Sequence, residues 1–130
     1  MNIVLTKRGD PIEVAARRAR NDAFRQSLTG GTVMLSAGVV AFGASNQARI
    51  IAAVRGFTGF DDGFTIGDPF DDHSIGDLEV EVEEPDIHRW PELIFFRIDD
   101  LGRPATDAGA SPAPATGTAL VLTLMLASEW

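Results

Sequence analysis

The first regular pattern along the chain is helical and covers residues 11–28. Pro11 suits the first turn of a helix, and the glycine pair at positions 30 and 31 is typical of residues that follow a helix end. Small and apolar side chains recur every three or four positions, as on one side of an amphipathic helix: Ile12, Ala15, Ala16, Ala19 and Ala23. The opposite side presents four polar residues: Arg17, Arg18, Asn21 and Arg25.

A strand and a second helix are predicted next. Residues 32–42 are rich in β-branched and large apolar side chains, which favours a buried strand with Gly38 as a candidate bulge. Ser45 is a residue type that commonly caps a helix N-terminus. Residues 46–55 then predict a helix that buries Ile50, Ile51 and Val54.

Residues 56–76 follow neither a helical nor a strand period. Glycines alternate there with phenylalanines, including Phe57, Phe60, Phe64 and Phe70. Glycine permits tight turns, and phenylalanine favours burial. We therefore expect an ordered loop that is pinned to the core.

A period of two begins at Asp77. In residues 77–84 apolar side chains alternate with acidic ones, which predicts a half-exposed strand with one acidic side. Residues 85–91 predict a turn that contains His88, Arg89 and Trp90. Residues 92–99 predict a second strand, the hairpin partner of the first.

The C-terminal part decides the fold class. Residues 102–117, rich in proline, alanine and glycine, predict a long loop. In residues 118–130 leucine recurs at every second position from 120 to 126, which favours a central strand with both faces buried, although the composition also suits a helix. The order of elements predicts one domain over residues 1–130, of the α+β class, with two helices packed on a mostly antiparallel sheet of about four strands.

Composition excludes several kinds of chemistry. The 130 residues include no cysteine and only two histidines, so a disulfide scaffold, a thiol nucleophile and a cysteine-ligated zinc site are excluded, and no cofactor is indicated. The N-terminal residues lack the apolar core of a signal peptide, and the apolar run at 119–127 is too short to cross a bilayer. We expect a cytoplasmic protein without a membrane partner.

Charge is segregated along the chain. Residues 1–60 carry eight Lys or Arg and three Asp or Glu, a net charge of +5, whereas residues 61–130 carry three Arg and sixteen Asp or Glu, a net charge of −13. Such an acidic half repels nucleic-acid phosphates and anionic lipids, so we expect no direct nucleic-acid binding through it. It suits a basic partner, or it serves only to keep a small protein soluble.

Several segments together resemble a known family. They are Asn21-Asp22-Ala23-Phe24-Arg25, Ser36-Ala37-Gly38-Val39, Asp68-Pro69-Phe70-Asp71-Asp72-His73-Ser74-Ile75-Gly76, Phe96-Arg97-Ile98-Asp99 and the closing residues 121–130. In this order they resemble the bacterial domain-of-unknown-function family 3768, which is common on plasmids and other mobile or accessory DNA. The resemblance spans nearly the whole chain. It implies an intact fold and a mobile-element setting, and it brings no known activity.

One loop carries the sharpest candidate for chemistry: Asp68, Asp71, Asp72 and His73. A histidine beside carboxylates suits a general base or a ligand of a divalent metal ion. The spacing fits no known metal motif. The alternative is structural: Asp68 caps a turn, and His73 satisfies buried backbone groups.

The acidic strand and its neighbours form the second candidate, a surface for a basic partner: Glu79, Glu81, Glu83, Asp61, Asp62 and Trp90. This favours a non-enzymatic interaction protein whose carboxylates imitate phosphate charge toward a nucleic-acid-handling or defence protein. The alternative is a metal-dependent or acid–base enzyme that uses the loop from Asp68 to His73. A homodimer held by the apolar C-terminal strand is a further hypothesis.

Overall fold

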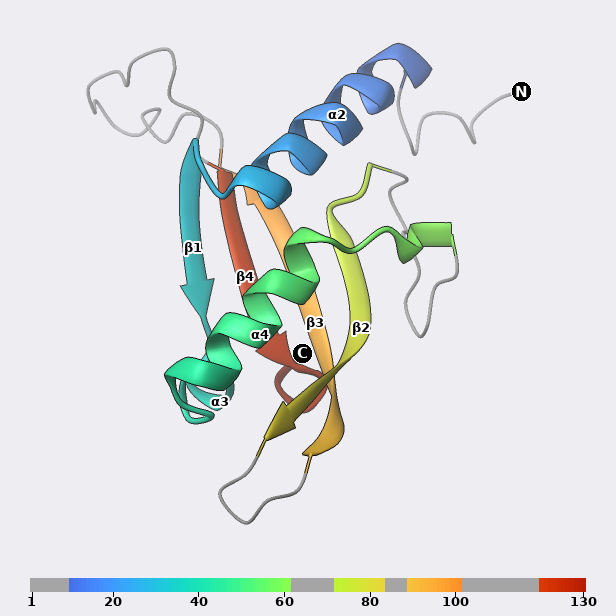
Figure 1. Cartoon of the computed structure of the whole chain (residues 1–130). Helices are drawn as coiled ribbons and strands as arrows, with labels where there is room; N and C mark the ends of the chain where they lie inside the picture. The colour runs from blue at the N-terminus through green and yellow to red at the C-terminus, as the bar shows by residue number, and fades with distance from the viewer. Residues whose placement is uncertain (1–9, 62–71, 84–88, 102–119) are drawn as a thin grey trace, which may run out of the picture.

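The structure is a computed structural model that describes residues 10–61, 72–83, 89–101 and 120–130. Figure 1 shows how its elements are arranged. In chain order they are α2 (Pro11–Ser27), β1 (Gly31–Leu35), α3 (Ala37–Val40), α4 (Ala44–Arg55), the 3-10 turn η1 (Gly59–Asp61), β2 (Ile75–Glu83), β3 (Arg89–Asp100), β4 (Leu120–Leu126) and the 3-10 turn η3 (Ala127–Glu129). The loop predicted at residues 102–117 lies outside the described residues, as do Phe64 and Phe70.

The four strands form one sheet in the order β1-β4-β3-β2. The β1–β4 pair is parallel, and the other two pairs are antiparallel. This confirms the predicted α+β fold with a mostly antiparallel sheet. It also confirms the C-terminal segment as a strand in the interior of the sheet. The strands predicted at 77–84 and 92–99 are confirmed as an antiparallel pair, observed as β2 at 75–83 and β3 at 89–100.

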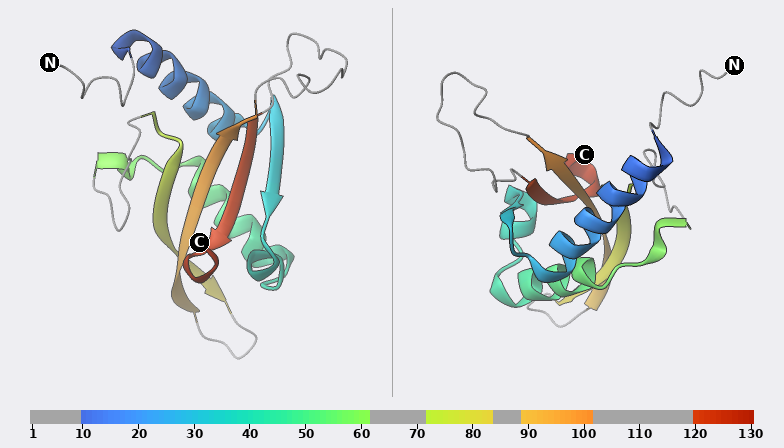
Figure 2. Two further views of the ribbon diagram at one scale, coloured as in Figure 1. Left: turned by 180° about the vertical axis from the view of Figure 1, so that it is seen from behind. Right: turned by 90° about the horizontal axis from the view of Figure 1, so that it is seen from above.

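The described chain has two layers, and the core lies between them. Helices α2 and α4 lie across one face of the sheet (Figure 2). On the other face, among the described residues, the C-terminal Trp130 packs against Phe95 of β3. The side chains that fill the space under the helices are Phe24, Val39, Ile50, Val54, Phe60, Val80, Val82, Ile94, Phe96, Ile98, Leu120, Leu122 and Leu124. We call the side of the sheet away from α2 and α4 the open face.

Helix α2 buries a different side from the one expected of an amphipathic helix. It begins where the Asp10 side chain accepts a hydrogen bond from the Ile12 backbone N–H at 2.8 Å. Ile12 is 76% exposed, and the four alanines on its side are exposed as well. The buried residues are Val14, Asn21, Phe24 and Arg25. The reason is that Asn21 and Arg25 have polar partners inside the fold, described below.

The strand predicted at 32–42 is wrong beyond Leu35. The Ser36 side chain accepts a hydrogen bond from the Val39 backbone N–H and starts the short helix α3, so Gly38 is a helical residue and not a bulge. A Cβ at Gly38 would lie 2.6 Å from Leu126 Cδ1, which explains a glycine at this point of close packing. Helix α4 begins after Gly43 and not after Ser45. It buries Ile50 and Val54 as predicted.

The C-terminal residues are fastened to the junction between β1 and α3. Glu129 Oε1 accepts hydrogen bonds from Ser36 Oγ at 2.5 Å and from the Leu126 backbone N–H at 2.8 Å. Glu129 Oε2 accepts from the Gly38 backbone N–H at 2.9 Å. The Ser36 hydroxyl, followed by these backbone donors, holds the pKa of Glu129 below its usual value of 4.5.

Strand β3 begins earlier than predicted. Arg89 and Trp90 already belong to β3, so the predicted turn at 85–91 is wrong at these positions, while residues 84–88 lie outside the described part. Trp90 faces Val82 across the β2–β3 pair. None of the helices in the described chain is long and apolar enough to span a bilayer.

Candidate functional site

Residues 72–74, just before β2, form a turn that we call the His73 turn. His73 has a backbone φ of +62°, a left-handed conformation that is uncommon for residues other than glycine. Non-glycine residues hold this conformation where surrounding contacts compensate its cost, and such residues cluster at functional sites. The contacts around His73 are therefore the first place to look for function.

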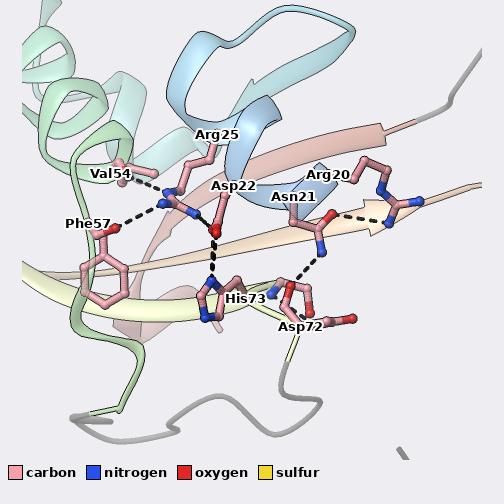
Figure 3. Close-up of polar contacts among 9 residues, drawn as sticks. Arg20, Asn21, Asp22, Arg25, Val54, Phe57, Asp72 and His73 are labelled. Atoms are coloured by element: carbon pink, nitrogen blue, oxygen red, sulfur yellow. Dashed lines mark hydrogen bonds and ion pairs between the residues drawn. The ribbon is translucent and has the colours of Figure 1, made fainter. Parts of the chain in front are cut away.

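Asp22 of α2 is the principal partner of the His73 side chain (Figure 3). His73 Nδ1 lies 2.9 Å from Asp22 Oδ1 and 3.1 Å from Asp22 Oδ2. The imidazole ring stacks on Phe60, with ring centroids 3.9 Å apart and planes 2° apart. Because a carboxylate can only accept hydrogen bonds, Nδ1 carries the proton. Asp22 and Phe60 together fix the orientation and the tautomer of the ring, as a carboxylate does for catalytic and metal-bound histidines.

Asp22 also serves the buried Arg25. Arg25 Nη1 donates to Asp22 Oδ1 at 2.9 Å, while Arg25 Nε and Nη2 donate to the backbone carbonyls of Val54 and Phe57, each at 3.0 Å. The Arg25 side chain is only 2% exposed and lies over the Phe60 ring. This network explains why α2 turns its polar side inward.

Asp72 and His73 do not converge on a common point. Asp72 Oδ2 pairs with Arg17 Nε at 3.3 Å, and Asp72 Oδ1 accepts from the Ser74 backbone N–H at 3.2 Å. The Asp72 carbonyl accepts from Asn21 Nδ2 at 2.9 Å. Within the described ranges, no group of three or more His, Cys, Asp or Glu side chains is placed to hold a metal ion. Asp68 and Asp71 of the predicted loop lie outside those ranges.

The second predicted site, the acidic side of β2, lies on the open face of the sheet. Glu79, Glu81 and Glu83 are exposed and alternate with the buried Val80 and Val82. We call these three glutamates the acidic edge, because β2 is the last strand of the sheet. Asp77, which opens the predicted acidic pattern, is only 4% exposed.

Two arginines neutralise part of the acidic edge. Arg89 Nε lies 3.1 Å from Glu83 Oε2, and Arg89 Nη1 lies 3.9 Å from Glu81 Oε1. Arg49 Nη2 of α4 reaches Glu83 Oε1 at 3.2 Å. Glu79 has no ion pair among the residues that the structure describes.

The other residues predicted for the partner surface are placed differently. Trp90 is 43% exposed, but its register with Val82 puts it on the side of the sheet that faces the helices. It is therefore not on the same face as the acidic edge. Asp61 ends η1, and Asp62 lies outside the described residues.

Comparison with known families matches residues 35–129 to the model described as a protein of unknown function, DUF3768. The chain belongs to this family. This confirms the resemblance found in the sequence. No curated protein and no solved structure matches the chain.

The DUF3768 match includes the His73 turn but begins after α2, so Asp22 lies N-terminal to it. The segments that carried the resemblance at 21–25 and 68–76 nevertheless meet in the fold, since Asn21 and Asp22 contact Asp72 and His73. Asp22 was not among the candidate site residues predicted from the sequence. The signal that pointed to it was its place in the segment 21–25, which resembles the family.

Proposed function

We propose that this DUF3768 protein is a non-enzymatic interaction module that presents its acidic edge to a basic protein surface. The observation that carries the proposal is the row of exposed glutamates on the last strand of the sheet. Residues on one side of a strand repeat every ~6.6 Å, so the row is a regular array of negative charge. A basic surface gains most from such an array when its own charges are equally regular.

The partner class follows from the same charges. A regular row of carboxylates offers the charge pattern that proteins gripping nucleic-acid backbones recognise. We therefore propose a nucleic-acid-handling or defence protein as the partner, with the acidic edge in the place of phosphates. A bacterial cytoplasm and an origin on accessory DNA are parts of the same proposal.

The test is capture of a partner from an extract of the native host by the tagged protein. The matched samples are the wild type and the variant Glu79→Gln/Glu81→Gln/Glu83→Gln, each at low and at high salt. We expect one basic protein to be captured by the wild type at low salt and lost at high salt, because salt screens exposed charges. The triple variant should lose it at both.

A control variant removes three carboxylates outside β2, namely Glu13→Gln/Glu92→Gln/Asp99→Asn. It changes the net charge by the same amount as the triple variant but leaves the acidic edge intact. It should therefore capture the partner as the wild type does. Equal capture by the wild type and the Glu79/Glu81/Glu83 variant would contradict the proposal.

Acid–base chemistry at His73 is a second candidate function, favoured by the contact between Asp22 and His73 Nδ1. In its metal-assisted form, Mg²⁺, Mn²⁺, Ca²⁺ or Zn²⁺ should raise the melting temperature by binding the folded state, and His73→Ala should abolish the rise. No rise with any of the four ions would remove that form of the hypothesis.

A further inference from the structure

The backbone of β2 has an outer side, away from β3, and the hydrogen bonds show which residues face it. Ser74 lies before β2, and its carbonyl accepts from the Ile98 backbone N–H of β3 at 2.7 Å. Glu83 faces the other way, because its backbone N–H and carbonyl both bond to the Asn46 side chain. The register is continuous from Ile75 to Glu83, so every second residue shares the direction of Glu83. The backbones of Glu79 and Glu81 therefore point outward.

Asn46 of α4 closes one end of this outer side. Its Oδ1 accepts from the Glu83 backbone N–H, and its Nδ2 donates to the Glu83 carbonyl, both at 2.8 Å. One side-chain amide thus makes the two bonds that a residue of a neighbouring strand would make. Within the described chain, no group bonds to the outward N–H and carbonyl of Glu79 or Glu81.

We infer that the outer side of β2 binds an extended, lysine- or arginine-rich segment of the partner as an added strand at Glu79 and Glu81. This inference rests on the proposed function and states the form in which the partner binds. Strand addition takes its affinity from backbone hydrogen bonds at an exposed sheet edge and its specificity from alternate side chains. Glu79 and Glu81 offer both an outward backbone for hydrogen bonds and alternate acidic side chains for specificity.

The side-chain geometry sets the sequence of the segment. Residues directly opposite Glu79 and Glu81 on an added strand would project onto the open face, beside the two carboxylates. Basic residues at every second position of the segment therefore meet the acidic edge. A segment with the same charges in a contiguous block would place half of them on the other side.

Charged side chains on a last strand also have a purely protective use, since they discourage pairing between sheet edges. The two uses predict different results when the charge is removed and the backbone donor is retained. A protective edge would self-associate after Glu79→Gln, whereas a binding edge would lose affinity for a basic strand. Sedimentation of the variant separates them.

The decisive comparison is between Glu79→Gln and Glu79→Pro in the full chain. Both remove the same charge, but only proline also removes the outward N–H and fills the space of an added strand. Proline is tolerated on a last strand where the N–H faces away from the sheet. The structure has such a case in Pro91, whose side of β3 has no strand partner because pairing with β4 begins at Ile94.

The probe is a fluorescent peptide in which lysine alternates with threonine, followed by fluorescence anisotropy. We expect Glu79→Pro to bind on the order of tenfold more weakly than Glu79→Gln, the loss that corresponds to one backbone hydrogen bond. Equal binding by the two variants would overturn strand addition. A peptide of the same composition with its lysines in one block should bind the wild type more weakly.

Hydrogen exchange of the wild type provides the second measurement, in case Glu79→Pro does not fold. Addition of the alternating peptide should slow exchange of the Glu79 and Glu81 amides and leave that of Val80, which faces β3, unchanged. No slowing at Glu79 and Glu81 would contradict the inference.

If the triple glutamine variant captures the partner normally, the proposed function fails. If only the proline comparison fails, the surface binds its partner without strand addition.

Discussion

Among single residues, Asp22 links helix α2 to the His73 turn. Its carboxylate accepts from Arg25 and from His73, so one side chain supplies the counter-charge of a buried guanidinium and orients an imidazole. His73 lies 51 residues further along the chain. No local pattern predicts such a contact, because helical and strand periods reach only a few positions. The sequence singled out Asp72 and His73 as candidate site residues. It did not single out Asp22, which contacts the His73 side chain.

The Asp22 network gives a stability prediction. Asp22→Asn keeps the size of the side chain but removes the charge that faces Arg25, so the buried guanidinium loses its counter-ion. We expect the free energy of unfolding to fall by about 1–3 kcal/mol, measured by urea denaturation. Glu13→Gln, an exposed change on the same helix, should stay within about 0.5 kcal/mol of the wild type. A similarly small effect for Asp22→Asn would contradict the role given to this carboxylate.

At the scale of elements, the sequence predicted what depends on local periodicity. Alternation identified β2 and β4, and the helical spacing identified α2 and α4. It did not predict which side of α2 is buried. Asn21 donates to a carbonyl of the His73 turn, and Arg25 donates to carbonyls in the last turn of α4 and in the segment after it. The end of β1 was also missed, since Ser36 starts a helix within an apolar run that reads as one strand.

The C-terminal turn gives a prediction of pH dependence. Hydrogen bonds from Ser36 and from two backbone N–H groups lower the pKa of Glu129 in the folded protein. A lowered folded-state pKa means that Glu129 stabilises the fold above its unfolded-state pKa, and that this contribution is lost as pH falls through the folded-state pKa. The difference in free energy of unfolding between the wild type and Glu129→Gln should therefore be full at neutral pH and shrink below pH 4.5. If the difference in free energy of unfolding stayed constant below pH 4.5, the hydrogen bonds to Glu129 would not lower its pKa in the folded protein.

At the scale of the whole molecule, the two oppositely charged halves of the sequence are partly paired with each other. Arg17 and Arg20 of α2 pair with Asp72 and Asp100, and Arg49 of α4 pairs with Glu83. The helices of the basic half thus contact the acidic half from one side of the sheet. The pairing leaves Glu79 and Glu81, on the open face, as the part of the acidic edge least neutralised by arginine.

Titration of the captured partner with the wild type and with Glu79→Gln/Glu81→Gln/Glu83→Gln, at a series of salt concentrations, tests whether the acidic edge binds it. We expect the affinity of the wild type to fall steeply as salt rises, and the variant to bind weakly with little dependence on salt. The same affinity and the same salt dependence for both proteins would show that the acidic edge does not bind the partner.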